Sequence, residues 1–138
     1  MKRVSSLLAA AALSLGFASG ASAELKIGFI YVGPVEDLGW TFRHDEGRKA
    51  IEQHFGNKVS TTFIENVPEG PAAVDAITDL AETGHGLIFT TSFGFMNPTN
   101  TVAANYPKVK FEHATGFTRN TDNMATFSAR FYEGRVIQ

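Results

Sequence analysis

The chain has 138 residues, of which 43% are hydrophobic and 19% are charged, and it contains no cysteine. This apolar fraction is too high for a disordered chain, and the lack of cysteine excludes a disulfide scaffold, a thiolate metal site, a cysteine nucleophile and a lipid-modified cysteine. The net charge of −2 gives no electrostatic reason to expect a nucleic-acid partner.

The first 23 residues have the pattern of a secretory signal peptide. A short basic start, Met1–Arg3, precedes an apolar run at Leu7–Phe17, and the small residues Ala21–Ala23 form the expected cleavage site. A transmembrane helix would need about 20 apolar residues, and polar residues interrupt this run sooner. We therefore expect residues 1–23 to be removed and the mature protein to be periplasmic, with no lipid anchor because no cysteine is present.

Strand and helix patterns alternate in the first half of the mature chain. Leu25–Val32 is almost continuously apolar, as is usual for a strand buried on both faces. The first helix is predicted over Trp40–Phe55, and a second strand over Val59–Val67. An amphipathic helix follows at Ala72–Thr83, where Gly84 suits the C-terminal cap.

The alternation continues in the second half. A third strand is predicted over Gly86–Phe93, followed by a helix with Asn97 as its N-cap, and a fourth strand over Val109–His113. The order β-α-β-α-β-α-β indicates an α/β fold with a parallel sheet. We expect residues 24–122 to form one lobe. Residues 123–138 read as a short strand and a helix without a stop signal, so we expect them to begin a connection to a further part of a longer protein.

Aromatic rings lie among glycines in two of the loops that leave the predicted strands. Trp40 follows Gly39, and Phe93 and Phe95 flank Gly94. Ligands of open parallel sheets bind outside the carboxyl ends of the strands, and an aromatic side chain there can stack on a flat ligand. The same rings could instead be core residues, and composition favours neither reading. The loops concerned are 33–41, 65–71, 92–98 and 115–123.

Three polar residues of these loops are candidates for hydrogen bonds to a ligand. Asp37 and Glu65 can accept hydrogen bonds from amino or hydroxyl groups, and Asn97 can both donate and accept. An enzyme acting at this edge would require converging carboxylates at the strand ends, and Asp37 with Glu65 is the only pair on offer.

Known catalytic and metal-binding motifs are missing from the sequence. It has no phosphate-binding loop, no dinucleotide fingerprint and no nucleophile elbow, and the four histidines lack metal-ligand spacing. We expect His44–Glu46, Arg48 and Lys49 to lie on a solvated helix face, and His113 to be either a structural histidine or a cleft residue. The sequence therefore predicts neither an enzyme nor a bound metal or cofactor.

The mature chain resembles one family along its whole length. Five segments resemble, in the same order, the N-terminal part of basic-membrane-protein-type substrate-binding proteins, which are the extracytoplasmic components of ABC importers. The segments are KIGFIYVGPVEDLGWTFRHDEGRKA, FIENVPEG, LIFTTSFGFMNPT, VKFEHATGF and DNMATFSARFYEGR. The most specific pieces are Asp37–Trp40 and Ser92–Met96. The resemblance implies a Rossmann-like lobe of a type I periplasmic-binding-protein fold, truncated before the second lobe, with the ligand held between two lobes.

The resemblance also implies roles for the loop residues. Trp40 would stack on a purine base or nucleoside, with Asp37, Gly39 and Thr41 nearby. The facing wall would come from Phe93, Gly94 and Phe95. Asn97 stands where the family commonly has an acidic residue, which is a departure from the family pattern at this polar position.

The function expected from the sequence is capture of a purine for an ABC importer. The expected partners are the small-molecule ligand and a permease in the inner membrane, with the protein itself a monomer. Two alternatives stay open: a secreted α/β enzyme that hydrolyses nucleosides, and a sugar-binding protein of the same fold.

Overall fold

A computed structural model describes residues 23–136 of the chain. The predicted signal peptide therefore lies almost entirely outside the described residues. The chain forms a five-stranded parallel sheet with strand order β2-β1-β3-β4-β5. The strands are β1 (Leu25–Ile30), β2 (Val59–Ile64), β3 (Leu87–Thr90), β4 (Lys110–Ala114) and β5 (Met124–Phe127). This arrangement confirms the predicted α/β parallel-sheet fold.

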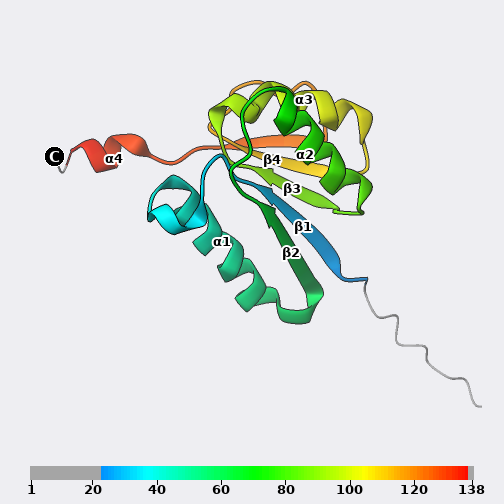
Figure 1. Ribbon diagram of the computed structural model, residues 1–138, viewed down its shortest axis with the longest axis horizontal. Coiled ribbons are helices and arrows are strands. Elements are labelled where there is room, and N and C mark those ends of the chain that lie inside the picture. The colour runs from blue at the N-terminus through cyan, green and yellow to red at the C-terminus, as the bar shows by residue number, and fades with distance from the viewer. Residues whose placement is uncertain (1–22, 137–138) are drawn as a thin grey trace, which may run out of the picture.

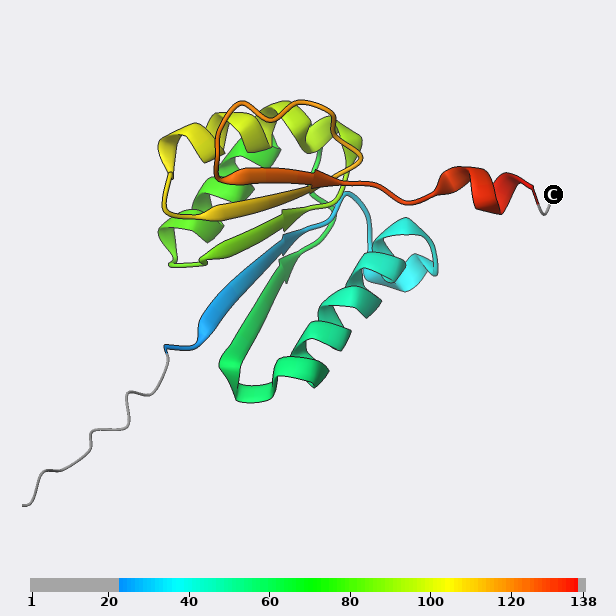
Figure 2. The ribbon, with the colours of Figure 1, turned by 180° about the vertical axis from the view of Figure 1, so that it is seen from behind.

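Helices cover the two faces of the sheet unequally (Figure 1). Helix α1 (Trp40–Phe55) lies on one face, and α2 (Pro71–Glu82) and α3 (Met96–Asn105) lie on the other. The view from behind shows α4 (Phe131–Arg135) on an extended linker beyond β5 (Figure 2). The short strand and helix predicted for the last residues are thus β5 and α4. β5 pairs with β4 in the same sheet, and the expected boundary at residue 122 stays a prediction.

Local sequence signals explain where the first two helices end. Helix α1 has the predicted bounds, with Gly39 before it and Gly56 after it. Helix α2 ends at Glu82, and Gly84 follows with φ of +86°, a left-handed conformation that favours glycine after a helix.

The third helix begins earlier than the sequence suggested. A 3₁₀ turn, η3 (Phe93–Phe95), runs directly into α3 at Met96, and the N-cap residue of α3 is Phe95. The prediction of Asn97 as N-cap is therefore wrong, because a carboxylate from another loop accepts the Gly94 N–H at the start of the turn. Asn97 lies exposed within the first turn of α3.

The α2–α3 face of the sheet holds the main hydrophobic core. Ile30, Ile88 and Phe111 from three strands pack with Ile77 of α2 and Val102 of α3, and all five are at most 1% exposed. Burying each such side chain contributes roughly 1.5–3 kcal/mol to stability. A smaller cluster on the α1 face contains Ile27, Phe29 and Tyr31.

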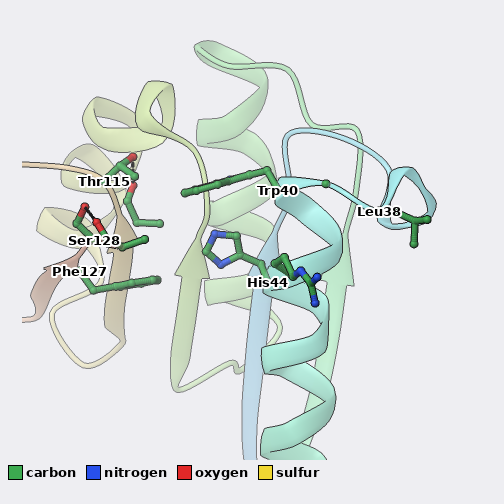
Figure 3. Close-up of a pocket in the computed structure, with 10 residues that line it drawn as sticks. Leu38, Trp40, His44, Thr115, Phe127 and Ser128 are labelled. Atoms are coloured by element: carbon green, nitrogen blue, oxygen red, sulfur yellow. Dashed lines mark hydrogen bonds between the residues drawn. The ribbon is translucent and has the colours of Figure 1, made fainter. Parts of the chain in front are cut away.

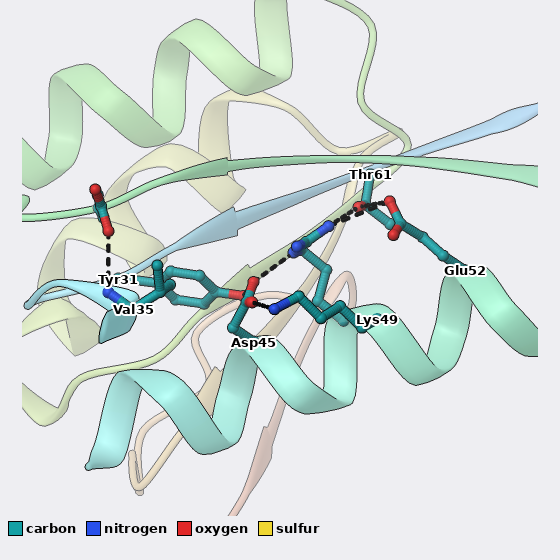
Figure 4. A network of polar contacts seen from close by, with 8 residues as sticks. Tyr31, Val35, Asp45, Lys49, Glu52 and Thr61 are labelled. Carbon is teal, nitrogen blue, oxygen red and sulfur yellow. Dashed lines mark hydrogen bonds and ion pairs between the residues drawn. The ribbon is translucent and has the colours of Figure 1, made fainter. Parts of the chain in front are cut away.

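A buried charge network joins α1 to the strands beneath it (Figure 4). Asp45 is 2% exposed and binds Arg48 at 2.6 Å and Lys49 at 2.8 Å, and it also accepts a hydrogen bond from the Tyr31 hydroxyl. Arg48 donates to Thr61 of β2 at 2.8 Å. The prediction that Asp45 and Arg48 are solvated is therefore wrong, because hydrogen-bond partners just after β1 (Tyr31) and on β2 (Thr61) allow both charges to be buried.

The network also sets the protonation of its members. Hydrogen bonds and charge from Arg48 and Lys49 overcome desolvation and lower the pKa of Asp45. Burial, with the charge of Asp45, raises the pKa of the Tyr31 hydroxyl. Asp45 is therefore ionised and Tyr31 is neutral near pH 7, which suits the hydrogen bond that the Tyr31 hydroxyl donates to the Asp45 carboxylate.

Candidate ligand-binding site

The candidate site lies at the carboxyl edge of the sheet, where the strand order changes direction. β1 lies beside β3 in the sheet, and the chain leaves β1 for α1 on one face and β3 for α3 on the other. Such a switch point separates the loops that follow the two central strands and leaves a crevice for a ligand. Here those loops follow β1 and β3.

Trp40 bridges this switch point. Its Nε1 donates a hydrogen bond to the carbonyl oxygen of Thr91, at a distance of 2.5 Å, and the side chain remains 38% exposed. The ring of His44, one turn further along α1, meets the indole edge-on with 4.6 Å between ring centroids. Trp40 is therefore held from two sides, and the ring of Phe131 in α4 lies nearly parallel to it with 6.1 Å between centroids, while part of the side chain stays exposed.

A pocket of about 630 Å³ opens beside Trp40 (Figure 3). Its lining is mainly apolar, with polar groups from α1, the β4 loop and the linker after β5. A volume and composition of this kind suit a small, flat organic ligand. The lining residues are Leu38, Gly39, Trp40, Arg43, His44, Ala114, Thr115, Phe127, Ser128 and Ala129.

The polar groups of the pocket suit an uncharged ligand. Burial lowers the pKa of His44, so that its imidazole is neutral near pH 7 and can donate one hydrogen bond and accept another. The Arg43 guanidinium is paired with Glu46 at 2.6 Å. Thr115 and Ser128 donate to neighbouring backbone carbonyls, and their hydroxyl oxygens can still accept.

Side chains and backbone groups tie neighbouring loops of this edge together. Glu65, in the β2 loop, accepts a hydrogen bond at 3.0 Å from the N–H of Val35 in the β1 loop. Glu69, also in the β2 loop, accepts from the Ser92 hydroxyl at 2.5 Å and from the Gly94 N–H at 3.0 Å, both in the loop after β3. The edge is therefore largely organised without a ligand, which lowers the cost of binding one.

A chain of hydroxyl groups ties the β3 loop to β4. Thr99 donates to the carbonyl oxygen of Phe95 at 2.7 Å, so the proton between Thr99 and Thr90, 2.9 Å apart, belongs to Thr90. Thr90 must then accept from Nδ1 of His113, 2.9 Å away. His113 is fully buried, and burial lowers its pKa. It is thus a neutral, structural histidine, and its Nε2 has no hydrogen-bond partner among residues 23–136.

Two of the nine residues that the sequence singled out line the pocket: Gly39 and Trp40. Asp37 lies exposed in the short η1 turn (Val35–Asp37), and Thr41 is buried at the start of α1. The structure thus brings the first group of predicted residues to one corner of the edge, with Glu65 bound to the backbone of the same loop.

The second predicted group divides between surface and core. Phe93 is 56% exposed at the edge, whereas Phe95 is completely buried in the α2–α3 core. Gly94 lies between them against Glu69, and Asn97 is exposed on α3. Phe93 therefore fits the prediction of a ring that can contact a ligand, and Phe95 fits the alternative prediction of a core residue.

Sequence reasoning missed several residues of this edge. His44 follows Trp40 at a spacing of four residues on a helix, which places both on one face and could have been recognised. Phe127 and Ser128 belong to β5 and its linker, and their approach to α1 depends on the strand order. Glu69 was missed because its partners, Ser92 and Gly94, are distant in sequence.

The chain matches a family model over residues 24–137, that of the PnrA-like substrate-binding proteins of ABC transporters called Bmp. The chain belongs to this family. The resemblance noted in the sequence is thereby confirmed.

Individual relatives agree with this assignment. A Brucella abortus (strain 2308) protein named as a purine-binding protein is 54% identical over 128 residues, which are 93% of this chain and 36% of that protein. A Haloferax volcanii protein provisionally named as an ABC transporter glucose-binding protein is 34% identical over 79% of this chain and 27% of its own length. The chain thus spans about a third of the curated relatives it matches.

A solved structure shows the same fold. The solute-binding protein of an ABC transporter system from Conexibacter woesei superposes with a TM-score of 0.66 at 15% identity, covering 75% of this chain and 35% of that one. This supports a lobe that makes up part of a larger solute-binding fold.

None of the helices within residues 23–136 has the length and hydropathy needed to cross a membrane. Over the same residues, no three His, Asp or Glu side chains gather closely enough to hold a metal ion.

Proposed function

We propose that this chain captures a purine base or nucleoside at the carboxyl edge of its sheet and delivers it to an ABC importer. The observation that carries the proposal is Trp40, which is held by Thr91 and His44 beside the pocket with part of its ring exposed. Stacking of a base on such a ring is worth about 1–3 kcal/mol. The 54% identity to a protein named as purine-binding supports the same ligand class.

Around Trp40, the other predicted residues have complementary roles in the proposed site. Asp37 and Glu65 supply carboxylates for amino or hydroxyl groups of the ligand, and Thr41 supports the start of α1. Phe93 and Gly94 form the facing wall, and Phe95 supports that wall from the core. Asn97 offers an amide from the first turn of α3.

The chain is proposed to act as one lobe of a two-lobed protein. Its length is about a third of its curated relatives', and a second lobe would close over the ligand at this edge. The working protein would be a periplasmic monomer, exported by the signal peptide, without a lipid anchor, that docks on a permease in the inner membrane.

A sugar is the second candidate ligand, because the Haloferax relative carries a glucose-binding name. A sugar would bind the polar groups of the edge through its hydroxyls and could pack a C–H face on Trp40, so the ligand panel below, rather than the exposed ring, separates the two classes. Nucleoside hydrolysis has less support, since Glu65, one of its two carboxylates, already accepts a backbone hydrogen bond.

Calorimetric titration of the complete gene product tests the proposal. The ligands are adenine, hypoxanthine, adenosine, inosine and glucose. We expect at least one purine to bind and glucose not to bind, and Trp40→Ala to weaken the purine about tenfold or more. Phe55→Ala, which removes an exposed ring at the other end of α1, is the matched control and should leave affinity unchanged.

Three outcomes would overturn the proposal. They are glucose binding without purine binding, an unaffected Trp40→Ala variant, and release of free base from a nucleoside during the titration. For residues 24–138 alone we expect weaker purine binding than for the two-lobed protein, because only one wall of the cleft is present.

A further inference from the structure

The Glu69 side chain makes an unusual contact with the loop that follows β3. Its Oε1 accepts hydrogen bonds from both the Ser92 hydroxyl and the Gly94 N–H. The carboxyl group also occupies the space in which a side chain at position 94 would lie, since a Cβ added to Gly94 would overlap it. Glu69 and the absence of a side chain at Gly94 therefore depend on each other.

This contact acts on the segment that carries the proposed ligand wall. Within Ser92–Phe95, Phe95 is fixed from below by complete burial in the core. Phe93 is exposed, and its nearest ring neighbour is Phe117, with 6.2 Å between centroids. Glu69 is the side chain that holds the outer side of this segment, through Ser92 and Gly94.

The carboxylate also takes the place of a missing helix cap. Ser92 precedes the η3 turn and makes no side-chain capping bond, and its hydroxyl donates to Glu69. Glu69 instead accepts the Gly94 N–H at the start of the turn, where a negative charge is favoured by the helix dipole. The position at which η3 and α3 begin thus depends on a residue 25 positions earlier in the chain.

We propose that Glu69 is a positioning residue of the ligand site, which sets the Ser92–Phe95 wall through its contacts with Ser92 and Gly94. The inference rests on the proposed function, since it assigns Glu69 to the same site. Glu69 need not touch the ligand. It acts by reducing the number of conformations that the wall can adopt before the ligand arrives.

A double-mutant cycle on the complete gene product tests the inference. The variants are Glu69→Ala, Gly94→Ala and the pair together, and the affinity is measured for the tightest-binding purine of the panel above. We expect Glu69→Ala to weaken that purine about fivefold or more and Gly94→Ala to weaken it as much. In the Glu69→Ala background, Gly94→Ala should cost less than twofold, because the added Cβ then finds open space.

Two further variants separate positioning from general stability. Glu69→Gln keeps an oxygen that can accept both hydrogen bonds, so it should restore affinity to within about twofold. Glu82→Ala removes another exposed carboxylate that ties two elements, through Tyr106 at 2.8 Å. It lies at the C-terminal end of α2, at the opposite edge of the sheet, and should leave purine affinity unchanged.

Amide hydrogen exchange supplies a readout that needs no ligand. The Gly94 N–H should exchange slowly in the unaltered protein and in Glu69→Gln, and about tenfold faster in Glu69→Ala. A purine that binds Glu69→Ala as well as the unaltered protein would overturn the inference and leave the proposed function standing. So would a Gly94→Ala cost that is the same in both backgrounds. If no purine binds the unaltered protein, the proposed function fails, and the inference fails with it even where Gly94 exchange changes.

Discussion

The α2–α3 face of the sheet and the α1 side with its carboxyl edge reach stability by different means. The first is dominated by a single apolar cluster whose central residues are almost completely buried. On the other side a small apolar cluster is combined with the Asp45–Arg48 charge network and the pocket beside Trp40.

The difference shows which substitutions each region tolerates. Apolar packing depends on volume and shape, so another side chain of similar size can replace a given one at small cost. Buried charges and hydrogen-bonded loops depend on particular partners, and removal of one leaves another unsatisfied. The Trp40 pocket of the proposed ligand site lies in the region built from particular partners, and the Phe93–Phe95 wall connects it to the apolar core.

Asp45→Ala should produce the largest loss of stability. It leaves the Arg48 guanidinium, 8% exposed, without its closest partner, and breaking one side of a buried pair costs up to about 3–5 kcal/mol. Urea unfolding measures the loss. Glu46→Ala breaks the exposed pair with Arg43 on the same helix and should cost less than about 1 kcal/mol. Equal losses in the two variants would contradict the distinction between the two kinds of pair.

Ile77→Ala should produce the next largest loss of stability. Ile77 is fully buried in the α2–α3 core, and deletion of such a side chain costs about 2–5 kcal/mol. Ile51→Ala, the same change at a half-buried residue of α1, should cost less than half as much when unfolding is followed in the same way. If Ile51 proves to be the more costly position, the α1 face carries more of the packing energy than its cluster suggests.

The smallest effect expected is a pH dependence from His113. Burial lowers its pKa in the folded state below the ordinary value of 6.5, so the unfolded chain binds the proton more readily. Stability should therefore fall as pH decreases through 6.5 towards the folded-state pKa. Unfolding free energies at about pH 7.5 and about pH 5.5 measure the fall.

The same experiment on two variants assigns the pH dependence. His113→Gln should reduce it, and His44→Gln should reduce it as well, because burial also lowers the pKa of His44. His54→Gln, at an exposed position near the end of α1, is the control. A dependence that survives in full in His113→Gln would show that other groups cause it.

Features that depend on residues close together in the sequence could be predicted from it, whereas features that depend on residues far apart in the sequence could not. The bounds of α1 and the approximate places of the first four strands follow from local signals, such as the glycines that flank Trp40–Phe55. The burial of Asp45 does not, since it depends on contacts with Tyr31, which follows β1, and with Arg48 on the next helical turn.

The candidate site shows the same division. Trp40 stood out because an indole beside a glycine at a strand end is a strong local signal. Phe93 and Phe95 have the same local signal, yet one is exposed and the other is buried, because the 3₁₀ turn points residues two positions apart in different directions. The Glu69 contact and the Phe127 side of the pocket depend on tertiary structure and could not be read from local patterns.

One paired measurement tests most directly the claim that the α2–α3 face supports the fold while the carboxyl edge binds the ligand. Purine affinity and unfolding free energy are measured together for the Trp40→Ala and Ile77→Ala variants of the complete gene product. The account predicts that Trp40→Ala weakens the purine about tenfold or more with the smaller loss of stability. Ile77→Ala should lose about 2–5 kcal/mol of stability while its folded fraction keeps the unaltered affinity. Loss of affinity in Ile77→Ala with none in Trp40→Ala would contradict it.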